Sequence, residues 1–290
     1  MKRALLLLAT LFAATLRPAA QEMKADAVLP IWDNATAPHS NELADPEGPV
    51  RDGRPVLTTR AVLYLYAPDP ATAKNRGVVI CPGGGYRHLS MENEGARMAE
   101  WFAANGYTAA VLHYRMPNGH PEVPLEDVEQ ALRLLTGAVP GAEGFTVAEA
   151  GVVGSSAGGH LAAMVSTMGS VRPAFTVLFY PVITADPAQR HQGSFDNLLG
   201  SQRSAENDRR YSLDTRVTEQ TPPAFLLLAD DDSTVPPTNA ARYYAALKAH
   251  GITASLHIYP IGGHGFGMRD TFPFKASWQA LLLDWLERLD

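Results

Sequence analysis

The chain has 290 residues, of which 46% are hydrophobic and 19% charged, a balance that suits one large globular domain with a sizeable core. Its formal net charge of -6 argues against nucleic acid or an anionic membrane surface as the main partner. A single cysteine, Cys81, excludes an internal disulfide, so the fold depends on its core alone.

The first twenty residues have the pattern of a secretory signal peptide. Met1-Lys2-Arg3 is basic, residues 4–16 are mostly apolar, and Pro18-Ala19-Ala20 supplies small residues before Gln21. The apolar stretch is short for a membrane span. We therefore expect residues 1–20 to be removed from a secreted or periplasmic protein that is not stably inserted in a membrane, with an uncleaved anchor as the alternative.

Residues 21–60 are rich in Pro, Asn, Asp and Gly and show little periodicity. Leu29-Pro30-Ile31-Trp32 is the one apolar cluster in this stretch. We expect an extended N-terminal arm that packs on the main domain with Trp32 as its anchor. Stacking of this indole on a sugar is the weaker alternative.

The remainder of the chain, residues 61–290, alternates between strand and helix patterns. Short apolar runs bounded by glycine, proline or polar residues predict strands, and apolar residues at helical spacing predict helices. This alternation predicts an α/β fold with a mostly parallel central sheet and helices on both faces. The predicted strands are 61–66, 77–81, 108–113, 151–154, 175–180, 225–229 and 255–259, and the predicted helices are 94–105, 125–135, 156–167, 239–250 and 274–289.

Residues 184–223 break this alternation. The stretch is long, polar and rich in Asp, Arg, Ser and Gln. A structureless loop of that length is unusual inside a compact domain and is often functional. It is therefore either a lid or insertion on the substrate side, or a surface elaboration.

Residues 152–160 read Val-Val-Gly-Ser-Ser-Ala-Gly-Gly-His, which places Gly-x-Ser-x-Gly between a predicted strand and a predicted helix. In this nucleophile-elbow arrangement the serine, Ser156, lies on a strained turn, and the flanking glycines let neighbouring backbones approach closely. The next amide lies at a helix N-terminus, where it can stabilise an oxyanion. The alternative is a glycine-rich turn with a structural serine.

Distinctive residues also follow three other predicted strands, and the carboxyl ends of parallel strands gather at one edge of a sheet. The run Pro82-Gly83-Gly84-Gly85-Tyr86 exposes backbone amides, as an oxyanion hole requires, and fits neither a P-loop nor a dinucleotide fingerprint. Asp230-Asp231-Asp232 suit a triad acid better than a metal site, because no histidines cluster beside them. His264 lies among four glycines in a close-approach loop.

Two further residues have a structural and a functional reading. Glu94 either accepts a hydrogen bond from a neighbouring loop or serves a helix N-terminus, and we favour the second. Cys81 ends an apolar run and is expected as a small buried core residue, with a nucleophilic cysteine as the alternative.

Ser156, an aspartate and His264 occur in the chain order of the α/β-hydrolases, which differs from the orders in chymotrypsin and subtilisin. Such a site hydrolyses esters through an acyl-enzyme, with the histidine as general base. The strand-end residues together therefore predict a serine hydrolase that requires no cofactor and no metal.

Several motifs of this chain match a known pattern. They are Cys-Pro-Gly-Gly-Gly-Tyr at 81–86, Glu94-Gly95, Tyr114-Arg115, Gly-x-Ser-x-Gly-Gly at 154–159, Thr221-Pro222-Pro223, Asp232-x-x-Val-Pro and Gly-Gly-His-Gly-Phe-Gly at 262–267. From about Leu29 to the C-terminus, the chain resembles secreted bacterial α/β-hydrolases of the acetylxylan-esterase type, relatives of bifunctional acetylxylan/feruloyl esterases. The resemblance is more specific for the fold and the triad than for the substrate.

The resemblance implies roles for the triad residues. Ser156 is the nucleophile and His264 the general base. In the family's Asp-x-x-Val-Pro motif the acid lies three residues before the valine, which is Asp232 here. Asp231 is the fallback, because the run of three aspartates blurs the register.

The resemblance also implies an oxyanion hole formed by Gly84, Gly85 and the amide of Ala157. The wider hormone-sensitive-lipase pattern begins with His-Gly-Gly-Gly, whereas this chain has Pro82 in place of the histidine and keeps the glycine amides. Tyr86 and Tyr114 are candidates for stacking on a sugar, with a place in the core as the equal alternative.

The expected substrate is an acylated carbohydrate, with acetylated xylan implied by the resemblance, or a small ester. A general small-ester carboxylesterase and a serine peptidase of the prolyl-oligopeptidase fold are the alternatives. Such peptidases usually carry a large extra domain, for which 290 residues leave no room. An intact triad argues against a non-catalytic binding protein, and the sequence does not indicate the oligomeric state.

Overall fold

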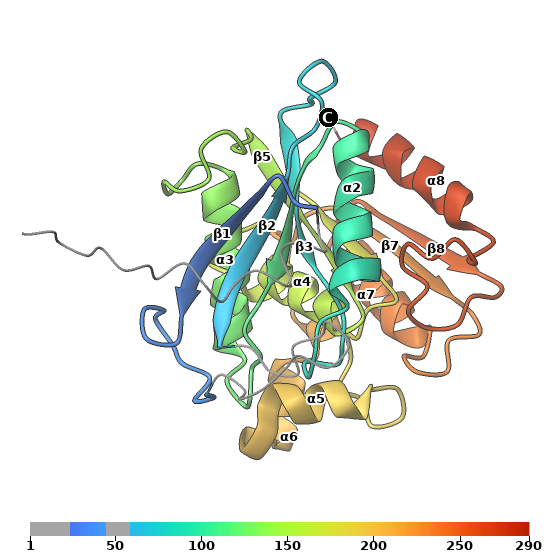
Figure 1. The fold of residues 1–290 in the computed structure, drawn as a ribbon. Helices are drawn as coiled ribbons and strands as arrows, with labels where there is room; N and C mark the ends of the chain where they lie inside the picture. The colour runs from blue at the N-terminus through green and yellow to red at the C-terminus, as the bar shows by residue number, and fades with distance from the viewer. Residues whose placement is uncertain (1–23, 45–58, 290) are drawn as a thin grey trace, which may run out of the picture.

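The computed structural model describes residues 24–44 and 59–289, with an α/β arrangement around one sheet (Figure 1). The expected signal peptide, residues 1–20, lies outside these described residues. In the part that is described, no helix is both long and apolar enough to cross a membrane.

The described strands form an eight-stranded sheet with the order β1-β2-β4-β3-β5-β6-β7-β8. β2 is antiparallel to both of its neighbours, and all pairs from β4 to β8 are parallel. The strands are β1 (Ala27–Asp33), β2 (Arg60–Tyr66), β3 (Arg76–Cys81), β4 (Thr108–His113), β5 (Glu149–Ser155), β6 (Thr176–Phe179), β7 (Ala224–Ala229) and β8 (Ala254–Tyr259).

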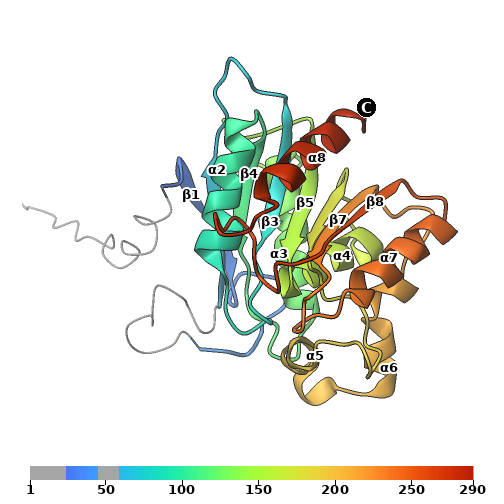
Figure 2. The ribbon, with the colours of Figure 1, turned by 90° about the vertical axis from the view of Figure 1, so that its right-hand side faces the viewer.

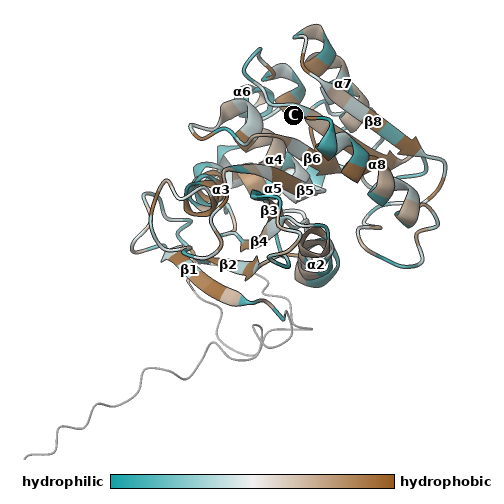
Figure 3. Cartoon of the chain, turned by 90° about the horizontal axis from the view of Figure 1, so that it is seen from above, coloured by the Kyte–Doolittle hydropathy of each residue, from teal (hydrophilic) through white to brown (hydrophobic). Residues whose placement is uncertain are grey.

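Helices cover both faces of this sheet. Seen from above, α2 and α8 lie on one side and α3, α4 and α7 on the other (Figure 3). The view in Figure 2 shows the same two layers. The predicted α/β fold, with a mostly parallel sheet between helices, is therefore confirmed. The helices are α2 (Arg97–Ala104), α3 (Glu122–Leu135), α4 (Ala157–Met168), α5 (Gln192–Leu199), α6 (Ala205–Arg210), α7 (Thr238–Ala249) and α8 (Lys275–Glu287), and a π-helical turn, η1 (Met91–Ala96), precedes α2.

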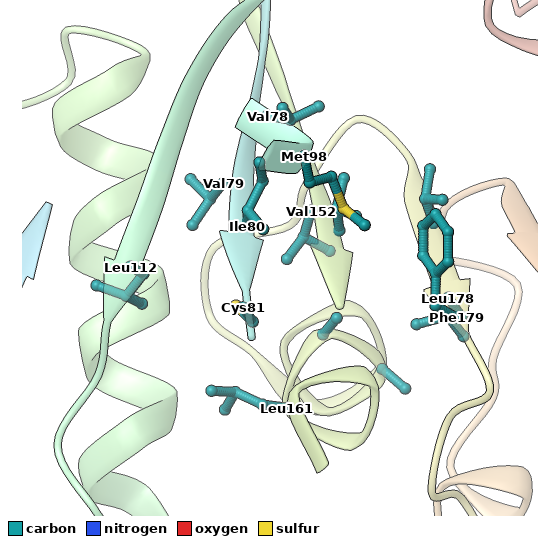
Figure 4. Close-up of a cluster of buried hydrophobic side chains, with 14 of the residues drawn as sticks. Val78, Val79, Ile80, Cys81, Met98, Leu112, Val152, Leu161, Leu178 and Phe179 are labelled. Atoms are coloured by element: carbon teal, nitrogen blue, oxygen red, sulfur yellow. The ribbon is translucent and has the colours of Figure 1, made fainter. Parts of the chain in front are cut away.

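The central strands are apolar along their whole length because helices cover them on both sides. In β3, Val78, Val79, Ile80 and Cys81 are all fully buried or nearly so (Figure 4). Burial raises the pKa of the Cys81 thiol, which disfavours the nucleophilic thiolate. Cys81 is thus a core residue, as expected.

The arm expected over residues 21–60 contains an edge strand. β1 pairs with β2 in antiparallel register, with an irregularity between Pro30 and Trp32. Proline is tolerated at an edge strand or a bulge, and it concealed the strand pattern in the sequence. The Trp32 indole donates to Asp127 in α3 at 2.5 Å, so this side chain anchors the arm. Residues 45–58 lie outside the described part.

Residues 184–223 contain two short helices that the sequence pattern did not predict. The segment contains α5 and α6 and lies at the end of the molecule where the parallel strands terminate (Figure 1). Ser204 caps α6 by accepting from the Asn207 amide at 3.1 Å, and Arg203 pairs with Asp208 at 2.8 Å. Both helices are short. α6 has no buried residue, and the apolar residues of α5, Phe195, Leu198 and Leu199, span too few turns to predict a helix from the sequence.

Candidate active site

Ser156 lies on the turn between β5 and α4, where the sequence predicted it. Its φ of 54° and ψ of -118° are unusual for a residue other than glycine, which is the strain expected of a nucleophile elbow. A Cβ atom at Gly154 would lie 2.2 Å from the Gly158 carbonyl oxygen, and one at Gly158 would lie 2.0 Å from the Cys81 carbonyl oxygen. Both glycines are therefore required for the backbone to close around the turn.

His264 connects Ser156 to Asp232. Its Nε2 lies 2.8 Å from Ser156 Oγ, and its Nδ1 lies 2.7 Å from Asp232 Oδ2. The other oxygen of Asp232 accepts from the amides of Thr234 and Val235, both at 2.9 Å, and the carboxylate is fully buried. This arrangement can hold the imidazole in the tautomer that accepts a proton from the serine.

The neighbouring aspartate has a different position. Asp231 accepts a hydrogen bond from the Gly263 amide at 2.7 Å, so it contacts the backbone of the loop that carries His264. The structure thus brings Asp232, the first choice from the sequence, to the imidazole and the fallback Asp231 to the loop. Among the described residues no group of histidine, cysteine and acidic side chains has the arrangement of a metal site.

The glycine loop after β3 lies beside the elbow. Gly84 and Gly85 have φ values of 139° and 65°, and a Cβ at Gly84 would lie 1.9 Å from the His88 carbonyl oxygen. Both residues line the same cavity as Ser156. Ala157 is the first residue of α4, so its amide is among the N-terminal donors of that helix. Gly84 and Gly85 thus share a cavity with Ser156, and Ala157 follows Ser156 directly in the chain.

Two tyrosines that we considered for sugar stacking are core residues instead. Tyr86 is 2% exposed and its hydroxyl lies 3.0 Å from His160 Nδ1. Tyr114 is fully buried and donates to the Pro82 carbonyl oxygen at 2.8 Å. Tyr86 has a left-handed φ of 58°, which helps to direct its side chain into the core. The pattern of apolar and polar residues in the sequence does not reveal this backbone conformation. Both side chains support the glycine loop from within the protein.

Glu94 lies in the first turn of a helix, as the favoured reading expected, but its side chain also makes the hydrogen bond to a neighbouring loop that was the alternative. It is buried in η1 and accepts hydrogen bonds from the Gly83 amide at 2.8 Å and from the Tyr180 hydroxyl at 2.7 Å. The sequence offered this reading as the alternative. Tyr180, which directly follows β6, was not singled out at all, although it too lies after a parallel strand.

A cavity of about 570 Å³ opens over Ser156 and His264. Every residue that lines it is a glycine or carries a polar or charged side chain. One wall comes from α5 and its N-cap and includes His191 and Asn197; Asn197 also donates to the Gly85 carbonyl oxygen at 2.7 Å. The polar composition of residues 184–223 had suggested a substrate-side segment, but it had not indicated His191 or Asn197.

Two histidines near the site, His160 and His191, have lowered pKa values. Burial lowers the pKa of His160 to about 4, so this ring is neutral at pH 7 and links Tyr86 to the Tyr211 carbonyl oxygen. The pKa of His191 is also lowered, first by burial and then by the nearby His264. His191 therefore presents a neutral imidazole to the cavity at neutral pH.

Two family models match the chain. The model described as BD-FAE matches residues 63–178, which include the glycine loop and Ser156. The prolyl oligopeptidase family model matches residues 138–289, which include Ser156, Asp232 and His264.

Known proteins are also similar. An acetylxylan esterase from Xylanibacter ruminicola is 37% identical over 226 residues, which cover 76% of this chain and 47% of that protein. Endo-1,4-beta-xylanase B from Butyrivibrio fibrisolvens is 29% identical over 234 residues, which cover 74% of this chain and 35% of that protein. The chain thus spans less than half the length of the curated relatives it matches.

A solved structure covers nearly the whole molecule. The acetyl ester-xyloside bifunctional hydrolase from Caldicellulosiruptor lactoaceticus is 32% identical, with a TM-score of 0.74 over 90% of this chain and 95% of that chain. A sugar hydrolase from Lactococcus lactis is 28% identical, with a TM-score of 0.67 over 81% of this chain and 98% of that chain. The chain therefore belongs to the acetylxylan esterase-like family of α/β-hydrolases.

Proposed function

We propose that this protein is a serine esterase that removes acetyl groups from acetylated xylan or xylo-oligosaccharides. The observation that carries the proposal is the hydrogen-bonded chain from Ser156 through His264 to Asp232 at the floor of a polar cavity. The acetylxylan esterase and the acetyl ester-xyloside hydrolase among its relatives support the choice of substrate.

In the proposed reaction, His264 takes the proton of Ser156 as the serine oxygen attacks the acetyl carbonyl carbon. Asp232 stabilises the imidazolium that forms. The amides of Gly84, Gly85 and Ala157 hold the oxyanion, and one such donor typically contributes about 10²–10³ in rate. The sugar hydroxyl leaves with the proton from His264, and water then releases acetate from the serine by the same steps in reverse.

The cavity lining supports a small acyl group on a hydrophilic alcohol. A long acyl chain would require apolar surface, and each buried methylene would then contribute about 0.8 kcal/mol. The residues that line this cavity are glycines or carry polar or charged side chains, so they provide no apolar side chain for such a chain to pack on, whereas they can hydrogen-bond to sugar hydroxyls. We also propose that residues 184–223 act as the substrate-side wall, because α5 and its N-cap contribute His191 and Asn197 to this lining.

We expect a series of aryl esters of one alcohol to show a strong preference for acetate. The specificity constant kcat/KM should fall at least about tenfold from acetyl to octanoyl, since the added methylenes find no apolar partner. Steady-state hydrolysis of acetyl, butyryl and octanoyl esters measures this. A constant or rising kcat/KM along the series would contradict the proposed acyl specificity.

The matching anilide of the acetyl ester separates an esterase from a peptidase of the prolyl-oligopeptidase type. An esterase should turn over the ester far faster than the amide, and release acetate from acetylated xylo-oligosaccharides. Comparable turnover of an aminoacyl anilide would favour the peptidase. We also propose export through the expected signal peptide, residues 1–20, which would bring the enzyme to extracellular polysaccharide. N-terminal sequencing of the secreted protein tests whether these residues are removed.

A further inference from the structure

Glu94 is a buried carboxylate that the proposed reaction does not use. It is 4% exposed, and both of its oxygens have donors from the protein. Oε2 accepts from the Gly83 amide at 2.8 Å, and Oε1 accepts from the Tyr180 hydroxyl at 2.7 Å. One side chain thus joins the glycine loop after β3 to the residue that follows β6.

The bond to Gly83 acts on the oxyanion-hole loop. A Cβ at Gly83 would lie 2.7 Å from Glu94 Oε2, 2.8 Å from the Ser155 carbonyl oxygen and 2.9 Å from Ser156 Cβ. Gly83 is therefore packed closely against both the Glu94 carboxylate and the nucleophile elbow. Glu94 thus contacts the loop directly before Gly84 and Gly85, the two glycines assigned to the oxyanion hole.

The bond to Tyr180 reaches the histidine. The Tyr180 ring contacts the His264 ring edge-on, with 4.8 Å between their centroids, and contacts Phe266 at 4.7 Å in the same way. Tyr180 has a left-handed φ of 36°, a conformation that persists in a tyrosine only where neighbouring contacts hold it. Its hydroxyl bond to Glu94 is one of these contacts.

We propose that Glu94 is a positioning residue that sets the geometry of the oxyanion-hole loop relative to Ser156 and His264, through Gly83 on one side and Tyr180 on the other. The inference rests on the proposed serine-esterase function. It adds a residue that acts on two parts of the site at once. Glu94 also lines the cavity, but both of its oxygens are engaged by Gly83 and Tyr180.

Variants of Glu94 can distinguish the effect of its hydrogen-bonding position from the effect of its negative charge. Burial raises the pKa of Glu94, and the bonds from Tyr180 and Gly83 and the charges of His264 and Arg269 oppose this rise. A neutral group of the same shape would still accept from the Gly83 amide. A shorter carboxylate would keep the charge but could not reach both partners.

The test compares Glu94→Gln, Glu94→Asp and Glu94→Ala for hydrolysis of an aryl acetate. Misplacement by about 1 Å costs on the order of 10²-fold in rate, so we expect kcat to fall by about that factor in E94D and E94A, with KM changed far less. E94Q should keep kcat within about fivefold of the wild type, because its carbonyl oxygen still accepts from the Gly83 amide and its NH2 group can donate to the Tyr180 hydroxyl oxygen. Glu92→Ala is the matched control, since Glu92 lies in the same turn, is exposed and pairs with Arg97.

Wild-type kcat in a folded E94A would overturn the proposal, as would an active E94D beside an inactive E94Q, which would assign the effect to charge. If E94A does not fold, the comparison of E94D with E94Q decides. The rate of fluorophosphonate labelling is also measured for the same variants. Labelling requires the nucleophile and the oxyanion hole but does not depend on the ester substrate. Slow labelling of E94D, together with labelling of E94Q at close to the wild-type rate, therefore supports the role of Glu94 even if the assigned substrate is wrong.

Discussion

Replacing Ser156 by alanine is expected to lower kcat for an aryl acetate by at least about 10⁴-fold while the protein stays folded. The hydroxyl oxygen of Ser156 is the atom that would bond to the acyl group in the acyl-enzyme. Without it, water must attack the ester carbonyl directly. The loss corresponds to about 5.5 kcal/mol of transition-state stabilisation. Initial-rate kinetics of purified wild type and S156A measure it.

The unusual backbone of Ser156 does not depend on the hydroxyl, because it follows from the close contacts of Gly154 and Gly158. The unfolding midpoint of S156A should therefore stay close to that of the wild type. Ser155→Ala is a matched neighbour, which should retain most of the activity. Substantial esterase activity in S156A, beyond any contamination, would exclude Ser156 as the nucleophile.

The second large effect is expected at the acid. Asp232→Asn should lower kcat by about 10³–10⁴-fold, because an amide in this place stabilises the wrong histidine tautomer and cannot balance the imidazolium. Asp231→Asn should cost less than about tenfold, since Asp231 contacts only the backbone of the histidine loop at Gly263. The two variants change the same residue type at adjacent positions and remove the same charge.

Steady-state kinetics of the two variants, with circular dichroism to check the fold, decides between the aspartates. A larger loss in D231N than in D232N would assign the acid to Asp231 and contradict the observed contact between Asp232 and His264. Equal small losses would mean that neither carboxylate stabilises the imidazolium.

The sheet could be predicted because its central strands are buried on both faces. Residues 78–80 and 225–229 are continuous apolar runs for that reason, and the turns that follow them carry the polar residues of the site. The chain order of Ser156, the aspartates and His264 then placed these residues at one edge of the sheet. Local pattern and strand order were sufficient for this part of the molecule.

The rest depends on contacts that no local pattern contains. β1 carries a proline and pairs at the edge, and α5 and α6 are short helices, each with a side-chain cap at its N-terminus. The side to which Tyr86 points depends on its left-handed backbone, which its residue type does not reveal. Glu94 meets Tyr180 across 86 positions of the chain, so this contact could be recognised only once the fold had brought together the segments that follow β3 and β6, on either side of β5.

Covalent labelling of the nucleophile tests whether Ser156 forms the acyl-enzyme. The wild-type protein is titrated with a fluorophosphonate, the modified residue is located by peptide mass spectrometry, and acetate release from acetylated xylo-oligosaccharides is followed in the same samples. We predict a single label on Ser156 and a loss of acetate release in proportion to labelling. A label on another residue, or acetate release that persists in the fully labelled protein, would contradict the proposed acyl-enzyme mechanism.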